Sequence, residues 1–179
     1  MVYIFLADGF EEIEALCPLD LLRRAGIETK TVGIGSKTIT GSHKIPVLCD
    51  ITDTELDGNE SFDMIILPGG LPGATNLDKS PVVDNFISRA IKEDKYIGAI
   101  CAAPFILGKR GLLKNKHACC YPGFENELLG AIVSNDGCVC DGKIITARAM
   151  GKSHEFALEI IKCLCGKEQA DKLSSSILY

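Results

Sequence analysis

The sequence predicts an α/β protein with a mostly parallel sheet that is covered by helices on both faces. Strand-like and helix-like segments alternate along the chain, which is typical of sheets whose parallel strands are joined by helical crossovers. Several strand-like segments are continuously apolar, as in VYIFLA (2–7) and YIGAI (96–100), which indicates burial on both faces. With 179 residues, the chain is expected to fold as a single domain over residues 1–179.

The elements up to residue 70 follow from hydrophobic pattern and turn residues. The first helix is expected to close on Gly26, and a hairpin is expected to turn near Gly41. In order, the predicted elements are a strand at 2–7, a helix at 8–26, a strand at 28–34, the hairpin at 37–48 and an apolar strand at 62–70 that ends in Pro-Gly-Gly.

The remaining elements carry clearer end signals. Ser80 can cap a helix and Pro81 suits its first position, while Asp141-Gly142 suits a hairpin turn. In order, the predicted elements are a helix at 80–94, a strand at 96–100, a helix at 102–110, a strand at 117–121, a hairpin around 141–142, an amphipathic helix at 153–166 and a short helical tail.

Charge and hydropathy exclude several classes of partner. The net charge is −5 and no basic cluster is longer than Arg23-Arg24, so nucleic acid is not expected as a partner. The apolar runs are too short to span a bilayer. The N-terminus lacks the basic segment and cleavage site of a signal peptide. A cytoplasmic protein that does not bind membranes is expected.

The cysteines are numerous, and their spacing does not match a known metal motif. Without a secretory signal, reduced thiols are expected. The two close pairs are C-x-C, not the C-x-x-C of zinc ribbons, so neither a metal site nor a cofactor is expected. Most of these thiols are expected to be small buried hydrophobic groups. The nine are Cys17, Cys49, Cys101, Cys119, Cys120, Cys138, Cys140, Cys163 and Cys165.

Cys101 lies where the predicted strand 96–100 meets the predicted helix 102–110. A strand–turn–helix elbow of this kind holds a nucleophile on a sharp turn, and the start of the helix directs unpaired N–H groups toward it. In parallel sheets the ligand site lies at the carboxyl ends of the strands. Cys101 is therefore the candidate nucleophile, and a purely structural role is the alternative. Small neighbours favour the tight turn: Gly98, Ala99, Ala102 and Ala103.

A reactive Cys101 requires a lowered thiol pKa, and the helix alone does not supply it. Free cysteine titrates near about 8.5, whereas reactive cysteines at helix N-termini titrate at about 3.5–7.5. Lowering the pKa by two to three units takes about 3–4 kcal/mol, and a helix N-terminus contributes about 0.3–2 kcal/mol. A second donor, with a contribution of about 1.5–3 kcal/mol, is therefore expected.

Glu14 can be that donor. On the first predicted helix, Phe10, Glu14, Cys17 and Leu21 recur at spacings of four, three and four, which predicts one buried stripe. Glu11 and Glu12 are expected to reach water instead. Burial raises the pKa of a carboxyl group, so a protonated Glu14 could donate to a thiolate and act as a general acid and base. The alternative is that Glu14 only snorkels or caps the helix.

With these residues in place, the chain resembles the DJ-1/ThiJ/PfpI superfamily, on its DJ-1/ThiJ side. The resemblance runs nearly end to end and implies a flavodoxin-like three-layer sandwich, usually homodimeric. Five segments carry it: LADGFEEIEALCPLDLLRRAG, IILPGGLPGATNL, AICAAP, YPGFE (121–125) and the closing FALEIIKCLCGKE.

The resemblance also implies roles for individual residues. Cys101 would be the nucleophile, and Glu14 would be its protonated partner. The backbone N–H groups of Gly70 and Ala102 would form an oxyanion hole, which needs no reorganisation during the reaction. The implied pocket is completed by Gly69, Tyr121 and His43.

Four departures from the family pattern bear on activity. Ala102 stands where the protease branch has histidine, which disfavours a Cys–His peptidase. Tyr121 replaces a histidine of some relatives and is a poor base, so the base role falls to Glu14. His43 replaces an arginine of many relatives, which makes any anion steering there sensitive to pH. Ala149-Met150 replaces a Gly-Pro pair and should alter the shape of the pocket.

Three classes of function remain open from the sequence. The leading one is a cofactor-independent glyoxalase or deglycase, acting on a small carbonyl substrate such as methylglyoxal or glyoxal through Cys101 and Glu14. The second is an oxidative-stress sensor or chaperone-like protein in which Cys101 is oxidised to a sulfinate. The third, a glutamine amidotransferase-like or peptidase activity, is disfavoured by Ala102.

Overall fold

The computed structural model covers residues 1–179 and contains a seven-stranded sheet of order β10-β11-β7-β6-β1-β2-β5. Every neighbouring pair is parallel except β10 and β11, which form an antiparallel hairpin at one edge. The mostly parallel sheet is as predicted. The strands are β1 (Val2–Leu6), β2 (Thr29–Gly33), β5 (Ile51–Thr52), β6 (Met64–Leu67), β7 (Tyr96–Ile100), β10 (Cys138–Asp141) and β11 (Ile144–Ala147).

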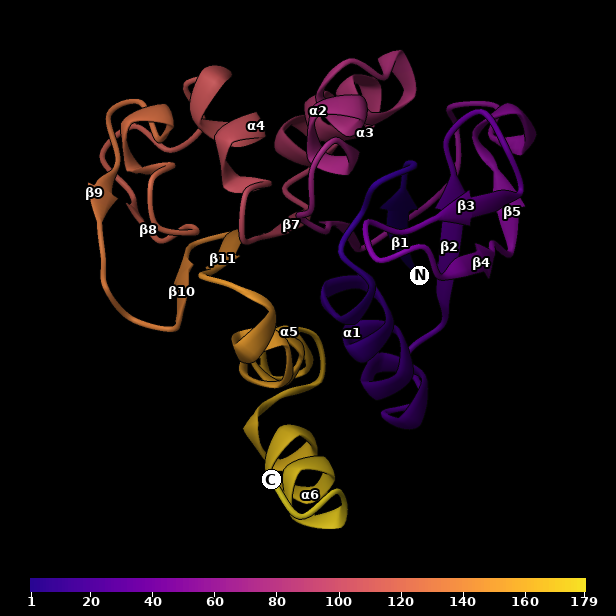
Figure 1. Ribbon diagram of the computed structural model, residues 1–179. Coiled ribbons are helices and arrows are strands. Elements are labelled where there is room, and N and C mark those ends of the chain that lie inside the picture. The colour runs from indigo at the N-terminus through magenta and orange to yellow at the C-terminus, as the bar shows by residue number, and fades with distance from the viewer.

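Helices cover both faces of this sheet, so the predicted three-layer α/β sandwich is confirmed (Figure 1). In Figure 1, α2, α3 and α4 lie above the sheet, and α1 and α5 lie below it, with α6 beyond α5. The helices are α1 (Glu12–Arg24), α2 (Gly73–Asp78), α3 (Pro81–Lys92), α4 (Pro104–Lys109), α5 (Ser153–Cys165) and α6 (Lys167–Ser176).

Two hydrophobic cores lie on the two faces of the sheet. Successive strand residues point to opposite faces, so Phe5 and Ile65 belong to the core beneath α2, α3 and α4. Ile4 and Ile66 belong to the core shared with α1, α5 and α6. Strands that supply both cores must be apolar throughout, which explains the continuous apolar runs in the sequence.

Short peripheral elements complete the structure. The predicted hairpin around Gly41 is present as β3 (Thr38–Thr40) and β4 (Pro46–Leu48), which pair antiparallel. A second small sheet joins β8 (His117–Ala118) to β9 (Ile132–Val133). Three single 3-10 turns occur at Asp53–Glu55, Glu125–Glu127 and Met150–Lys152. No helix has both the length and the apolar character needed to cross a membrane.

Some element boundaries differ from the sequence prediction. The first helix begins at Glu12 rather than residue 8, because Asp8 and Gly9 form a turn in which Gly9 has a φ of 87°, and Glu11 is the extended N-cap residue. Helix α2 was not predicted from the sequence. The strand predicted at 117–121 stops at Ala118. At α3 the prediction is confirmed: Ser80 accepts a hydrogen bond from the Val83 N–H and Pro81 is the first helical residue.

Candidate active site

Cys101 occupies a strained elbow directly after β7. Its φ is 64°, in the left-handed region, which costs a non-glycine residue about 1–3 kcal/mol. The backbone around it is held from both sides, because its N–H donates to the Ala147 carbonyl at 2.8 Å and its carbonyl accepts from the Tyr121 N–H at 2.8 Å. The side chain is partly exposed. The elbow is therefore present as predicted, with Cys101 partly buried against the core and partly exposed.

Glu14 lies on α1 and is completely buried, with no exposed surface. Its Oε2 accepts a hydrogen bond from the Gly69 N–H at 2.9 Å, whereas Oε1 is buried without a hydrogen-bond partner. The capping role is filled by Glu11, whose carboxylate accepts from the Glu14 N–H at 2.8 Å. The alternatives that Glu14 snorkels or caps are therefore wrong.

The surroundings of Glu14 favour its protonated form. Burial raises the pKa of this carboxyl to about 7, and the negative charge of Glu11 raises it as well. The nearby Cys101 thiol, the hydrogen bond from the Gly69 N–H and the nearby Met150 N–H lower this pKa and so act in the opposite direction. A neutral carboxyl group can use its proton to satisfy an otherwise partnerless buried oxygen.

Cys101 does not have the lowered pKa that the sequence argument expected. Burial raises the pKa of its thiol, and the nearby carboxylate of Glu14 raises it further, whereas the N–H groups of Ala102 and Gly70 lower it. The repulsion acts only while Glu14 is ionised. The two groups therefore titrate as a pair, and removal of both protons is the costly step because it leaves two buried anions in contact.

Gly69 lies against both Glu14 and Cys101, and its position leaves no room for a side chain. A Cβ added there would lie 2.6 Å from Glu14 Oε2 and 2.7 Å from Cys101 Cβ. Both contacts are shorter than real Cβ contacts. The absence of a side chain at this position is what lets Glu14 and Cys101 approach each other.

The N–H groups expected to form the oxyanion hole are available. Neither the Gly70 N–H nor the Ala102 N–H donates to a backbone carbonyl, and both lower the pKa of Cys101. Gly70 has a φ of 82°, a conformation that glycine adopts without strain. Two backbone donors therefore lie beside the sulfur, where an anion could be stabilised.

His43 pairs with a carboxylate other than the one at the elbow. Its Nδ1 lies 2.9 Å from Glu12 Oε2, and its backbone N–H donates to Glu12 Oε1 at 2.8 Å. The prediction that Glu12 reaches water is wrong, because the loop between β3 and β4 covers it and leaves it 2% exposed. Although burial raises it, hydrogen bonds from His43 hold the pKa of Glu12 below its usual value. The His43 ring itself is exposed.

Tyr121 reaches the elbow through its backbone, whose N–H binds the Cys101 carbonyl. Its side chain is about half exposed, at 48%. Two further groups contribute to the site and were not predicted from the sequence: the Ala147 carbonyl, which accepts from the Cys101 N–H, and the Met150 N–H beside Glu14. Both are backbone groups, which residue type does not distinguish, so only the three-dimensional structure shows that they contribute.

A family model described as the DJ-1/PfpI family matches residues 1–163. The chain belongs to the DJ-1/PfpI family. It is 34% identical over 178 residues to "Protein dj-1beta" of Drosophila melanogaster, covering 98% of this chain and 95% of the relative. It is also 35% identical to "Protein DJ-1 homolog B" of Arabidopsis thaliana, but spans only 41% of that longer protein.

Two further matches concern function and structure. The chain is 30% identical over 164 residues to a Caenorhabditis elegans protein named "Glutathione-independent glyoxalase DJR-1.2", covering 91% of this chain and 87% of that protein. Among solved structures, "Toxoplasma gondii DJ-1, oxidized" superposes with a TM-score of 0.95 at 33% identity, covering 99% of this chain and 97% of the other. The DJ-1/PfpI fold thus agrees with the sandwich described above.

Proposed function

We propose that this DJ-1/PfpI protein is a cofactor-independent enzyme of the glyoxalase III or deglycase type. Its substrates would be methylglyoxal, glyoxal or early glycation adducts, and its products 2-hydroxy acids. The observation that carries the proposal is the fully buried Glu14, whose Oε1 has no partner, beside the strained Cys101 elbow. The glyoxalase name of the C. elegans relative supports the same reaction class.

The chemistry begins with one proton shared by Cys101 and Glu14. When Glu14 holds it, the thiolate attacks the aldehyde carbon, a C–S bond forms and the carbonyl π electrons move to oxygen. The N–H groups of Gly70 and Ala102 stabilise the resulting oxyanion. Glu14 then protonates this oxygen, which yields a hemithioacetal and leaves a carboxylate.

The second half of the reaction moves one proton between adjacent carbons. The Glu14 carboxylate removes the proton from the carbon that carries sulfur and delivers it to the neighbouring carbon, while the hydroxyl proton of the hemithioacetal passes to the oxygen of that neighbouring carbon. The aldehyde carbon is thereby oxidised and its neighbour reduced, giving a thioester of a 2-hydroxy acid. Water attacks the carbonyl carbon of the thioester and the C–S bond breaks. The hydroxyl group of water stays on the 2-hydroxy acid, and its proton returns to Glu14, so that the Cys101 thiolate and the protonated Glu14 are restored. Methylglyoxal plus water becomes lactate, without an external oxidant.

The activity test is direct. Purified protein incubated with methylglyoxal, without glutathione or metal, is expected to form lactate detectable by proton NMR. Cys101→Ser should abolish lactate formation, and Cys165→Ser, which changes an exposed thiol on another part of the surface, should not. Equal turnover by wild type and Cys101→Ser would contradict the proposal.

A second function, oxidation sensing, is favoured by the partial exposure of the Cys101 side chain next to two backbone donors. The donors that stabilise an oxyanion could equally hold sulfinate oxygens. Peptide mass spectrometry after mild peroxide treatment is expected to find Cys101 modified first. Earlier oxidation of the exposed thiols Cys140 and Cys165 would exclude this role.

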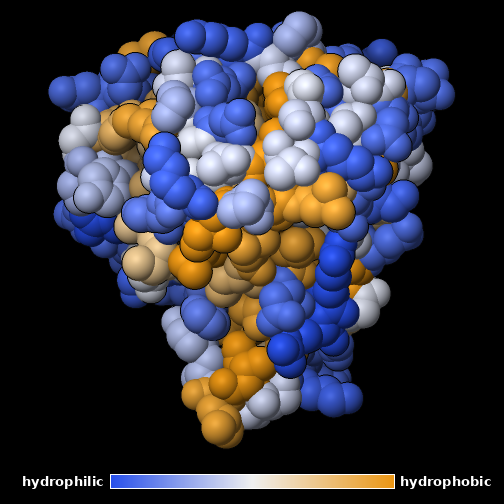
Figure 2. Space-filling model, turned by 45° about the vertical axis from the view of Figure 1, so that its right-hand side comes forward, coloured by the Kyte–Doolittle hydropathy of each residue, from blue (hydrophilic) through white to orange (hydrophobic).

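We further propose that the protein acts as a homodimer. Large apolar side chains are exposed on α1 and around β4, and Figure 2 shows hydrophobic residues gathered across this side of the molecule. Patches of this kind on soluble chains usually mark interaction surfaces. Light scattering on the purified protein should give twice the chain mass of 19.2 kDa, and a monomer at micromolar concentration would refute the dimer. The residues concerned are Ile13, Ile45 and Leu48.

A further inference from the structure

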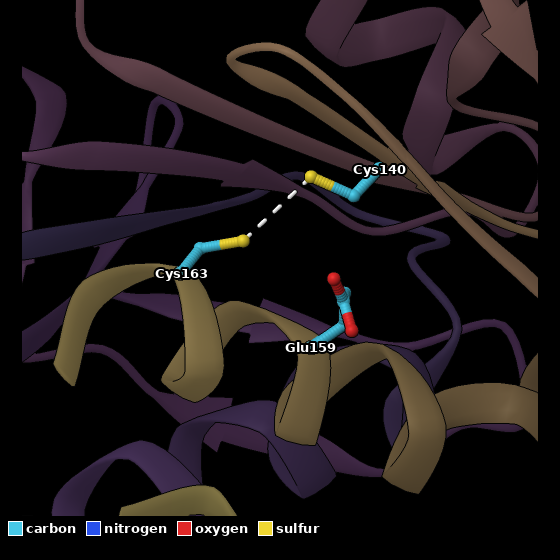
Figure 3. A group of neighbouring side chains, drawn as sticks. All are labelled: Cys140, Glu159 and Cys163. Atoms are coloured by element: carbon cyan, nitrogen blue, oxygen red, sulfur yellow. Dashed lines mark hydrogen bonds between the residues drawn. The ribbon is translucent and has the colours of Figure 1, made fainter. Parts of the chain in front are cut away.

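A second cluster of thiols and a carboxylate lies away from the elbow, between the sheet edge and α5. It consists of Cys140 on β10 and of Glu159 and Cys163 on α5. Figure 3 shows the two cysteine side chains directed toward each other with the Glu159 carboxylate beside them. The two Sγ atoms are 3.6 Å apart, and one ligand atom from each residue lies within 4.8 Å of the others.

The fold creates this cluster from residues that are remote in sequence. Glu159 and Cys163 are four residues apart on α5, so they share one face of the helix. That helix packs against β10, the edge strand that carries Cys140. One cysteine from each C-x-C pair is thus brought to the same place, although neither pair has the spacing of a metal motif by itself.

We propose that Cys140, Cys163 and Glu159 form a binding site for a thiophilic divalent cation of the zinc class. Tetrahedral zinc with Zn–S bonds of about 2.3 Å places two sulfur ligands about 3.8 Å apart. The observed 3.6 Å is close to this separation and well beyond the about 2.05 Å of a disulfide. Carboxylate oxygen is a common third ligand, which leaves one position for water.

Charge and access are compatible with such a site. Two thiolates and one carboxylate carry three negative charges, and a divalent cation together with the Lys162 ammonium balances them. Lys162 Nζ lies 3.0 Å from Glu159 Oε2 and so orients the carboxylate, as outer partners do at metal sites. Cys140 is exposed, so an ion can reach the cluster from solvent, and Cys163 also lines a surface hollow of about 420 Å³.

The site is separate from the proposed catalytic centre. The hollow is also lined by Lys95 and Tyr96, at the beginning of β7, whereas Cys101 follows the end of the same strand. A cation bound here would therefore leave the elbow free. The reaction proposed above needs no metal, and the cation site stands or falls independently of it.

The test uses reduced, chelator-treated protein carrying Cys101→Ser, so that the elbow thiol cannot contribute. Titration with Co²⁺ is expected to produce thiolate charge-transfer and tetrahedral d–d absorption bands that saturate at one ion per chain, and Zn²⁺ should displace them. Adding Cys140→Ser or Cys163→Ser should weaken Zn²⁺ binding at least about tenfold, and Glu159→Gln should weaken it less. Cys165→Ser is the matched control and should bind as tightly as the parent.

Several results would overturn the proposal. These are no binding by the reduced parent, unchanged affinity in both the Cys140→Ser and Cys163→Ser variants, an equal loss in Cys165→Ser, or saturation at one ion per two chains. Loss of 2 Da through a Cys140–Cys163 disulfide, without Zn²⁺ binding by the reduced form, would identify a redox pair instead. Circular dichroism of each variant checks that it is folded, and only folded variants enter the comparison.

Discussion

Two regions of this molecule combine cysteine with glutamate, and they differ in the burial of the glutamate and in the charged groups beside it. At the elbow, Glu14 is fully buried, has no cation near it and contacts a partly exposed Cys101. On α5, Glu159 is partly exposed and paired with Lys162 beside Cys163 and Cys140. The buried carboxyl is driven toward its neutral form, as a proton donor requires. The other carboxyl lies beside an ammonium group, so the two glutamates have different surroundings and suit different chemistry.

The largest difference between the two regions is expected when Glu14, the carboxyl paired with Cys101, can no longer carry an exchangeable proton. Glu14→Gln keeps the size of the side chain but cannot exchange a proton, so kcat/KM for methylglyoxal should fall by about 10²- to 10⁴-fold. Glu159→Gln makes the same chemical change in the other region and should leave kcat/KM unaltered. Steady-state kinetics at pH 7 decide the matter, and comparable losses in both variants would remove the distinction.

The two glutamates should also differ in how they affect the pH dependence of the free energy of unfolding. The pKa of Glu14 is raised to about 7 from an ordinary value of 4.5, so the folded state binds this proton more tightly than the unfolded state does. The associated stabilisation, on the order of 3 kcal/mol, is fully present below pH 4.5 and lost as the pH rises through about 7.

Urea unfolding between pH 4.5 and pH 8 measures this effect. The free energy of unfolding of the wild type is expected to decline relative to that of Glu14→Gln over this interval. Glu159→Gln should follow the wild type. Parallel pH profiles for the wild type and Glu14→Gln would show that Glu14 is ionised in the folded protein throughout.

Gly69→Ala tests the close approach of Glu14 and Cys101 by steric means. The new methyl group would lie 2.6 Å from Glu14 Oε2 and 2.7 Å from Cys101 Cβ, so we expect a loss of about 1–3 kcal/mol in unfolding free energy together with reduced activity. Gly151→Ala is the control, because its Cβ would meet nothing within 4 Å. Equal thermal midpoints for the two variants would mean that the elbow is looser than described.

The smallest effect is expected at His43, which lies outside the contact between Cys101 and Glu14. His43→Ala removes one partner of the buried Glu12, while the backbone N–H of residue 43 remains bound to it. Thermal stability should decrease slightly, and kcat/KM should change less than in Glu14→Gln. Hydrogen bonding to Glu12 raises the pKa of His43, so this stabilisation fades as the pH rises. A loss of activity as large as that of Glu14→Gln would place His43 in the reaction.

How far the sequence predicts the site depends on the kind of signal that each residue leaves. The helical spacing of the predicted stripe on α1 identified Glu14, which is buried, although Cys17 in the same stripe is only partly buried. The same pattern predicted that Glu12 is in solvent, and this prediction is wrong. Glu12 is covered by a loop from residues 41–45, and the periodicity of a helix carries no information about contacts with a remote loop. The direction of the Cys101 pKa was wrong for a related reason: helix and donor effects are local, whereas burial depends on the whole fold.

The order of apolar runs, turn residues and small residues along the chain was sufficient to determine the α/β class, most elements and the elbow at Cys101. Local backbone preferences and hydrophobic periodicity act over a few residues, and for that reason they can be read from a linear string. Only the tertiary structure decided that Glu14 has a partnerless oxygen, that Glu12 is covered, and that Cys140 meets Cys163. These depend on contacts between remote segments, whose distances and desolvation are set by packing.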